Sequence, residues 1–142
     1  MEITFDRLKH SLEVAKKMKK IVLENQEKYS CTPEDMFILG LVHDIGYEFA
    51  NEQPQHAVVG GMALKNQGYK YWKEVYYHSR IQNEYMSNEL LLLNYADMTT
   101  GPHGESMSLT QRHEDVVKRY GKGSHQDLEV AEVIKQLVEF EK

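Results

Sequence analysis

The chain has 142 residues, 41% hydrophobic and 27% charged, so it can bury one core but is too short for two ordinary domains. Its formal net charge of -5 argues against the broad basic surface that binds duplex nucleic acid. No apolar run approaches the length that crosses a bilayer, and the first residues lack a signal-peptide pattern. We therefore expect a single cytoplasmic domain over residues 1–142.

The first predicted helix begins at Phe5 and is amphipathic. Its apolar positions recur at steps of three and four residues, at Leu8, Leu12, Ala15, Met18 and Val22. His10 lies midway between Leu8 and Leu12 in sequence, which places it away from the centre of this apolar face.

A second helix is predicted from Thr32, because a hydroxyl N-cap followed by Pro33 and two acidic residues favours a helix N-terminus. Residues 36–42 are apolar on every side, which predicts a central buried helix. We expect it to end near Gly46 in the left-handed conformation, with His43 and Asp44 in its last turn.

Two further helices are predicted in the middle of the chain. Pro54 opens the first, which carries His56 in its first turn, contains small residues that allow close helix contact, and ends near Gly68. The second runs from Trp72 to Ile81 with His78 near its end; its tyrosines and valine would also tolerate a strand.

Three more helices complete the prediction. Ser87 caps one that leads through four leucines to Asp97, Ser108 with Gln111 forms a capping box for the next, and Ser124 begins the last. The loop at 99–106 is expected to border the functional site. The predicted fold is all-α, a single-domain helical bundle of about six to seven helices.

The His43-Asp44 pair is the strongest chemical signal. It closes an apolar run, so an imidazole and a carboxylate emerge together from buried structure, as in a metal site. Cys31 is the only cysteine, which excludes a thiolate cluster and leaves nitrogen and oxygen ligands.

With His10 before it and Asp97 after it, this pair resembles the metal-binding set of the HD-domain superfamily of metal-dependent phosphohydrolases. The resemblance covers almost the whole chain, from the segment 7–12 to the segment 94–97. It implies that His10, His43, Asp44 and Asp97 bind a first divalent metal. Two imidazoles and two carboxylates suit Fe, Mn, Co, Ni or Zn better than Ca²⁺.

The resemblance also implies a second metal. His56 and His78 lie where two-metal members of the superfamily carry extra histidines, and Asp44 would bridge the two ions. Two cations about 3.5–4 Å apart can clamp the phosphoryl oxygens and the leaving group. One or two divalent transition metals are therefore expected.

The implied activity is hydrolysis of a small phosphorylated molecule, such as a nucleotide or dinucleotide, by attack of a metal-activated hydroxide on phosphorus. Two alternatives stay open. Some superfamily members with a similar ligand set are di-iron oxygenases, and a metal-stabilised module that binds a ligand without catalysis is the other alternative. The sequence leaves the oligomeric state open, a homodimer included, and gives no sign of a membrane partner.

Three residues near the implied ligands are candidates for supporting roles. Arg80 and Arg112 would bind substrate phosphate through their bidentate guanidinium groups, although arginines at such positions are more often surface or salt-bridge residues. Glu48, with Asp44, would serve catalysis as an acid or base, and an exposed loop acid is the alternative for Glu48.

Overall fold

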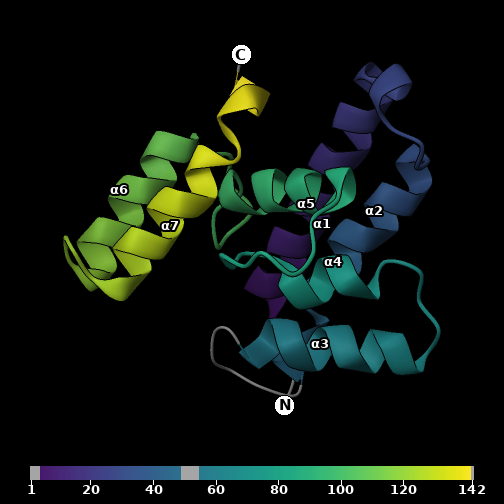
Figure 1. The fold of residues 1–142 in the computed structure, drawn as a ribbon, viewed down its shortest axis with the longest axis horizontal. Coiled ribbons are helices and arrows are strands. Elements are labelled where there is room, and N and C mark those ends of the chain that lie inside the picture. The colour runs from purple at the N-terminus through teal and green to yellow at the C-terminus, as the bar shows by residue number, and fades with distance from the viewer. Residues whose placement is uncertain (1–3, 49–54, 142) are drawn as a thin grey trace.

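The structure is a computed structural model that describes residues 4–48 and 55–141. Within these ranges it contains seven α-helices, three short 3₁₀ helices and no strand, which confirms the predicted all-α fold. The α-helices are α1 (Phe5–Glu24), α2 (Pro33–Val42), α3 (Gln55–Asn66), α4 (Trp72–Tyr77), α5 (Asn88–Met98), α6 (Leu109–Tyr120) and α7 (His125–Lys135) (Figure 1). The 3₁₀ helices are η1 (Gln26–Lys28), η2 (Ile45–Glu48) and η3 (Val138–Glu141).

Four of the predicted helix starts are confirmed by their caps. The hydroxyl groups of Thr32, Ser87, Ser108 and Ser124 each accept a hydrogen bond from the backbone N–H three residues later. The capping box between Ser108 and Gln111 is complete, since the Gln111 side chain accepts from the Ser108 N–H at 2.8 Å. Polar side chains therefore determine where these helices begin.

The predicted apolar face of α1 is buried at Ala15, Met18 and Val22 but not at the N-terminal end of the helix. His10 and Ser11 are buried, whereas Leu8 and Leu12 are 55% and 38% exposed. The apolar spacing placed His10 away from the core, but its imidazole is turned inward by contacts with Asp97 and the Gly101 carbonyl. Polar contacts made by residues distant in sequence thus override the helical hydrophobic pattern at this end of α1.

The predicted central position of α2 is also wrong. Ile38 and Leu41 are 48% and 42% exposed, because α2 packs mainly against α1 along one face. The two helices approach closely at Gly40, where a Cβ atom would lie 2.5 Å from the Ala15 Cα. The helix with the larger share of buried residues is α5, which contributes Leu92 and Leu93 to the main hydrophobic core.

The end of α2 lies four residues before the predicted end at Gly46. The helix stops at Val42, His43 is the C-cap residue, and Asp44 lies in the turn that leads into η2. Gly46 does not have the predicted left-handed backbone. A glycine is needed here because a Cβ atom would lie 1.6 Å from the backbone oxygen of His56, so η2 packs directly on α3.

One of the two middle helices is shorter than expected. Pro54 lies outside the described residues, and α3 ends at Asn66, where the predicted terminator Gly68 follows with a φ of 77°. The segment from Trp72 forms a helix and not the alternative strand, but it ends at Tyr77. His78 is already extended, and the chain then turns sharply.

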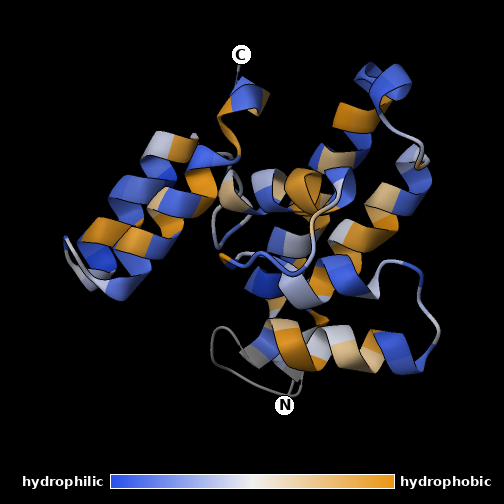
Figure 2. Ribbon diagram, viewed as in Figure 1, coloured by the Kyte–Doolittle hydropathy of each residue, from blue (hydrophilic) through white to orange (hydrophobic). Residues whose placement is uncertain are grey.

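The helices form two hydrophobic clusters. The larger joins α1, α2, α4 and α5, whereas Met98 at the end of α5 packs with Leu109, Val133 and Leu137 of the C-terminal segment. In Figure 1, α6 and α7 lie side by side and apart from the other helices. Figure 2 shows hydrophobic and hydrophilic residues interspersed on both, as in amphipathic helices. No helix in the described part of the chain is long and apolar enough to cross a bilayer.

Candidate metal centre

The six predicted ligands come together from five helices. His10 lies on α1, the His43-Asp44 pair directly follows α2, and Asp97 lies in the last turn of α5. His56 is in the first described turn of α3, and His78 immediately follows α4. All four imidazole rings are buried. The fold brings together residues far apart in sequence, such as His10 and Asp97, which are separated by 87 residues.

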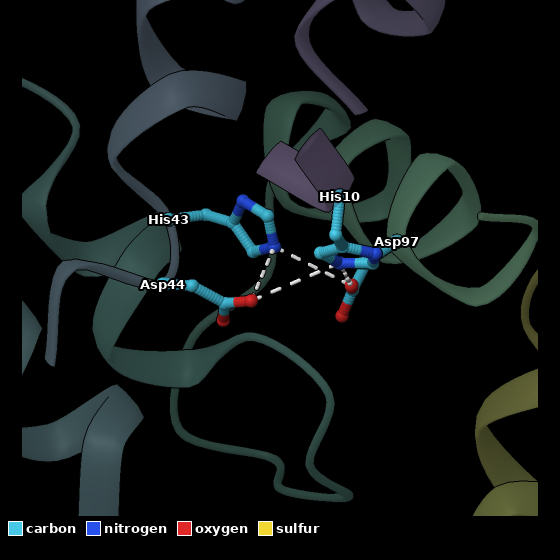
Figure 3. A group of neighbouring side chains, drawn as sticks. All are labelled: His10, His43, Asp44 and Asp97. Atoms are coloured by element: carbon cyan, nitrogen blue, oxygen red, sulfur yellow. Dashed lines mark hydrogen bonds and ion pairs between the residues drawn. The ribbon is translucent and has the colours of Figure 1, made fainter. Parts of the chain in front are cut away.

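One group consists of His10, His43, Asp44 and Asp97, whose side chains point toward one another in Figure 3. Asp97 Oδ1 lies 2.8 Å from His10 Nε2 and 3.3 Å from His43 Nε2. Asp44 Oδ2 lies 3.7 Å and 3.3 Å from the same two nitrogens. Two imidazole nitrogens thus face two carboxylates, a donor set that could hold a divalent transition metal.

A second group is built on the other oxygen of Asp44. Its Oδ1 lies 3.1 Å from His56 Nε2 and 3.4 Å from His78 Nε2. In each group the potential ligand atoms lie within 4.8 Å of one another. The two carboxylate oxygens of Asp44 are therefore divided between the groups, which is the arrangement of a bridging carboxylate.

Hydrogen bonds on the far side of three rings fix the nitrogen that faces the cluster. Nδ1 donates to a backbone carbonyl in each case: His10 to Gly101 at 2.9 Å, His43 to Gly40 at 2.6 Å, and His78 to Val75 at 2.5 Å. Because a carbonyl only accepts, Nδ1 is protonated in each ring, and Nε2 is the nitrogen left to bind a metal. The Gly101 contact also confirms that the loop at 99–106 borders the site.

Three of the Nε2 atoms are buried without a hydrogen-bond partner in the described part of the chain, those of His43, His56 and His78. Burying a polar nitrogen without a partner is costly unless another group satisfies it. These nitrogens surround the carboxylate oxygens of Asp44 and Asp97 at 3.1 to 3.4 Å. The donor set therefore fits divalent cations.

The electrostatics keep both carboxylates ionised. Burial acts to raise the pKa of Asp44, but the charge of His43 and the nearby imidazoles of His43, His56 and His78 outweigh it and hold that pKa well below its usual range. The pKa of Asp97 is lowered in the same way, since His10 and His43 outweigh burial. Burial also lowers the pKa of His56, which favours its neutral form. Two negative charges and a neutral imidazole match the needs of a cation site.

Sequence reasoning missed Ser79 and Asn94, which support Asp97. The Ser79 hydroxyl donates to Asp97 Oδ2 at 2.6 Å, and the Ser79 N–H donates to Asn94 Oδ1 at 2.8 Å. Ser79 has φ of 62°, a left-handed conformation that is uncommon outside glycine. Asn94 stands one turn before Asp97, a spacing that could have suggested its role, but nothing in the sequence marks Ser79.

The guanidinium groups of the two predicted substrate-binding arginines are directed at backbone carbonyls. Arg112 donates to the carbonyls of Met98, Asp97 and Thr100, at 2.9, 3.3 and 2.5 Å. Arg80 donates to the Tyr76 carbonyl and lies over the Tyr76 and Tyr77 rings. The structure does not bring either group into the His/Asp cluster, and their phosphate contacts stay predictions. Glu48 ends η2, and its side chain is outside the described part of the structure.

A large surface groove lies away from the cluster. Its volume is about 940 Å³, and it is lined by Lys17, Thr99 and Phe140 among other residues between α1 and the C-terminal segment. None of the six predicted ligands lines it. The chemistry of the donor atoms, and not the size of the groove, therefore locates the candidate site.

The fold and the site together define an all-α protein with a histidine and carboxylate centre suited to divalent metals. The family model described as HD domain matches residues 7–101, which is more than half of the chain. The protein therefore belongs to the HD-domain superfamily of metal-dependent phosphohydrolases. The matched region contains all six predicted ligands, whereas α6 and α7 follow it. Neither the curated proteins nor the solved structures include a significant match.

Proposed function

We propose that this protein is a metal-dependent phosphohydrolase acting on a small phosphorylated molecule, such as a nucleotide or dinucleotide. The observation that carries the proposal is the division of the Asp44 carboxylate, with Oδ2 facing His10 and His43 and Oδ1 facing His56 and His78. Membership of the HD-domain superfamily supports hydrolysis as the reaction.

The side chains of the two groups would serve as metal ligands. His10, His43, Asp44 and Asp97 would hold one ion, and Asp44, His56 and His78 would hold another. Bound divalent ions supply the Lewis acidity that activates water for attack on phosphorus and offset charge on the phosphoryl oxygens. The two aspartates provide the negative charge, and the buried imidazoles add neutral donors. Nitrogen and oxygen ligands in these numbers suit Fe, Mn, Co, Ni or Zn.

Metal analysis combined with an activity screen tests the proposal. The full chain is purified anaerobically, its metal content is measured, and release of inorganic phosphate from a panel of nucleotides and dinucleotides is followed with Mn²⁺ or Co²⁺ without O₂. We expect about two ions per chain and phosphate release. The His43→Ala variant should lose the ion of the first group and phosphate release, whereas His125→Ala, which changes an exposed histidine on α7, should retain both ions and phosphate release.

Two results would contradict the proposal. Substrate turnover that requires O₂, accompanied by an iron EPR signal, would identify an oxygenase. Metal-loaded protein that binds nucleotides and leaves them intact would identify a binding module.

A further inference from the structure

His56 is held differently from the other three histidines of the centre. Their Nδ1 atoms each donate to a backbone carbonyl, whereas His56 Nδ1 has no hydrogen-bond partner within the described residues. Its ring is nevertheless fully buried, and Nε2 lies 3.1 Å from Asp44 Oδ1. Some other contact must therefore set the orientation of this imidazole.

An aromatic stack provides that contact. The Tyr47 ring lies against the His56 ring with a centroid distance of 4.2 Å and an interplanar angle of 13°. The Arg7 guanidinium carbon lies 3.3 Å from the Tyr47 ring centroid. Two planar groups this close cannot occupy the same ring face, so Tyr47 lies between Arg7 and His56.

We infer that Tyr47 and Arg7 are positioning residues for His56, and that this stack replaces the hydrogen bond that orients the other three imidazoles. Stacking fixes the plane of the ring, and the cation on the opposite face of Tyr47 holds the tyrosine in place. The inference rests on the proposed function, in which His56 binds the second ion.

The stack also connects the two halves of the centre. Arg7 stands one turn before His10 on α1, so the helix that supplies a ligand to the first group also supports a ligand of the second. Loss of an outer partner of a ligand typically weakens metal binding about 10–100-fold. Disturbing the stack should therefore weaken the second ion selectively.

Binding of Mn²⁺ to the full chain tests this, measured by titration calorimetry with equilibrium dialysis. Tyr47→Leu removes the aromatic surface, and Tyr47→Phe keeps it without the hydroxyl. Phe140→Leu is the matched control, because it breaks a similar stack with Tyr95, at 4.7 Å and 12°, away from the six ligands. We expect at least about tenfold weaker binding of the second ion in Tyr47→Leu only, with the first ion unchanged.

The metal-free protein gives an independent measurement. Long-range ¹H–¹⁵N spectra report which ring nitrogen of each histidine carries the proton. We expect the ring signals of His10, His43 and His78 to be the same in the wild type and in Tyr47→Leu, with the altered ring signals confined to His56. Arg7→Met, at a half-buried position, is the second variant should Tyr47→Leu fail to fold, and it should also weaken the second ion.

The outcomes separate the inference from the proposed function. A wild-type protein that binds fewer than two ions would overturn both the two-metal centre and the inference. If the wild type binds two ions and Tyr47→Leu binds the second with unchanged affinity, the inference alone is wrong. Weakened binding in Tyr47→Phe would assign the effect to the hydroxyl and overturn stacking as the cause, and unchanged binding in Arg7→Met would overturn the role of Arg7.

Discussion

Two regions of this protein each contain a close histidine–aspartate pair, and only one of them forms a candidate metal centre. The body, α1 to α5, gathers four histidines and two aspartates, whereas the hairpin, α6 and α7, contains the pair His113 and Asp127. His113 Nε2 lies 2.5 Å from Asp127 Oδ1, closer than any His–Asp contact in the body. Short distance alone therefore does not distinguish a site.

The difference lies in how the polar atoms are satisfied. Asp127 Oδ2 accepts from the Gly123 N–H at 2.7 Å and Oδ1 contacts His113, so both oxygens have partners within the hairpin, and the His113 side chain is 39% exposed. In the body, the imidazoles are buried and three Nε2 atoms have no hydrogen-bond partner among the described residues. Convergent, buried and unsatisfied lone pairs indicate a metal site, whereas a locally satisfied pair indicates a structural turn.

Replacing Asp44 should have the largest effect. Asp44→Asn removes the negative charge that both groups share and replaces one of the two oxygens by an amino group that cannot bind a cation, so we expect the protein to lose both ions and its phosphatase activity. Metal affinity should fall by more than about 100-fold, because loss of even an outer partner costs about 10–100-fold. Elemental analysis and phosphate release measure these effects.

The matched control is Asp127→Asn in the hairpin, which should retain metal and activity. Circular dichroism checks that both variants keep the helical content of the wild type. Retention of two ions by folded Asp44→Asn would remove the proposed distinction between the two regions.

Ser79 tests whether the supports of the ligands matter as well as the ligands. Ser79→Ala and Ser79→Gly both remove the hydroxyl that donates to Asp97, so each should weaken metal binding about tenfold. They should differ in stability, because glycine adopts the left-handed backbone at this position without strain and alanine does not. We expect Ser79→Gly to be more stable than Ser79→Ala by about 1 kcal/mol in urea denaturation of the metal-free protein. Equal stability with unchanged metal binding would contradict both roles.

The fold class could be predicted from the sequence, and so could the six candidate ligands that lie together in the structure. Helix starts are local signals, and the caps at Thr32 and Ser108 follow from side chains within three residues of the helix. The candidate ligands could be named because the order of His10, the His43-Asp44 pair and Asp97 resembles that of a known superfamily, and the structure brings these side chains together.

The remaining features depend on contacts between distant segments. The spacing of Leu8 and Leu12 placed His10 away from the centre of the apolar face. His10 is nevertheless buried, because its imidazole contacts Asp97 on α5. The sequence predicts Gly46 as a helix terminator, but in the structure a glycine is needed there because η2 packs directly against the backbone of α3. The stacking of Tyr47 on His56 is likewise a tertiary contact, and no local pattern around either residue encodes it.

Arg112 tests how the hairpin is joined to the body. This α6 residue donates to carbonyls at the end of α5 and in the following loop, so Arg112→Lys should remove some of these three hydrogen bonds. We expect a loss of about 1–2 kcal/mol in the free energy of unfolding, with metal affinity unchanged. Urea denaturation and Mn²⁺ titration measure the two quantities. An increased KM with unchanged stability would instead support the predicted phosphate contact of Arg112.

The smallest effect is expected within the hairpin, from the charge of Asp127. The Gly123 N–H, and then the hydrogen bond with His113, lower the pKa of Asp127 below its ordinary value of 3.8. A carboxyl group whose pKa is lowered by folding stabilises the folded state above its unfolded pKa, and this contribution is lost as pH falls through the folded pKa. Asp127→Asn should therefore speed hydrogen exchange of the Gly123 amide and the first turn of α7 at neutral pH. The difference from the wild type should disappear as the pH falls below 3.8 and through the folded pKa, where the native carboxyl is also protonated. Faster exchange in α1 to α5 at neutral pH would show that the hairpin and the body are energetically one unit, and would break the comparison between them.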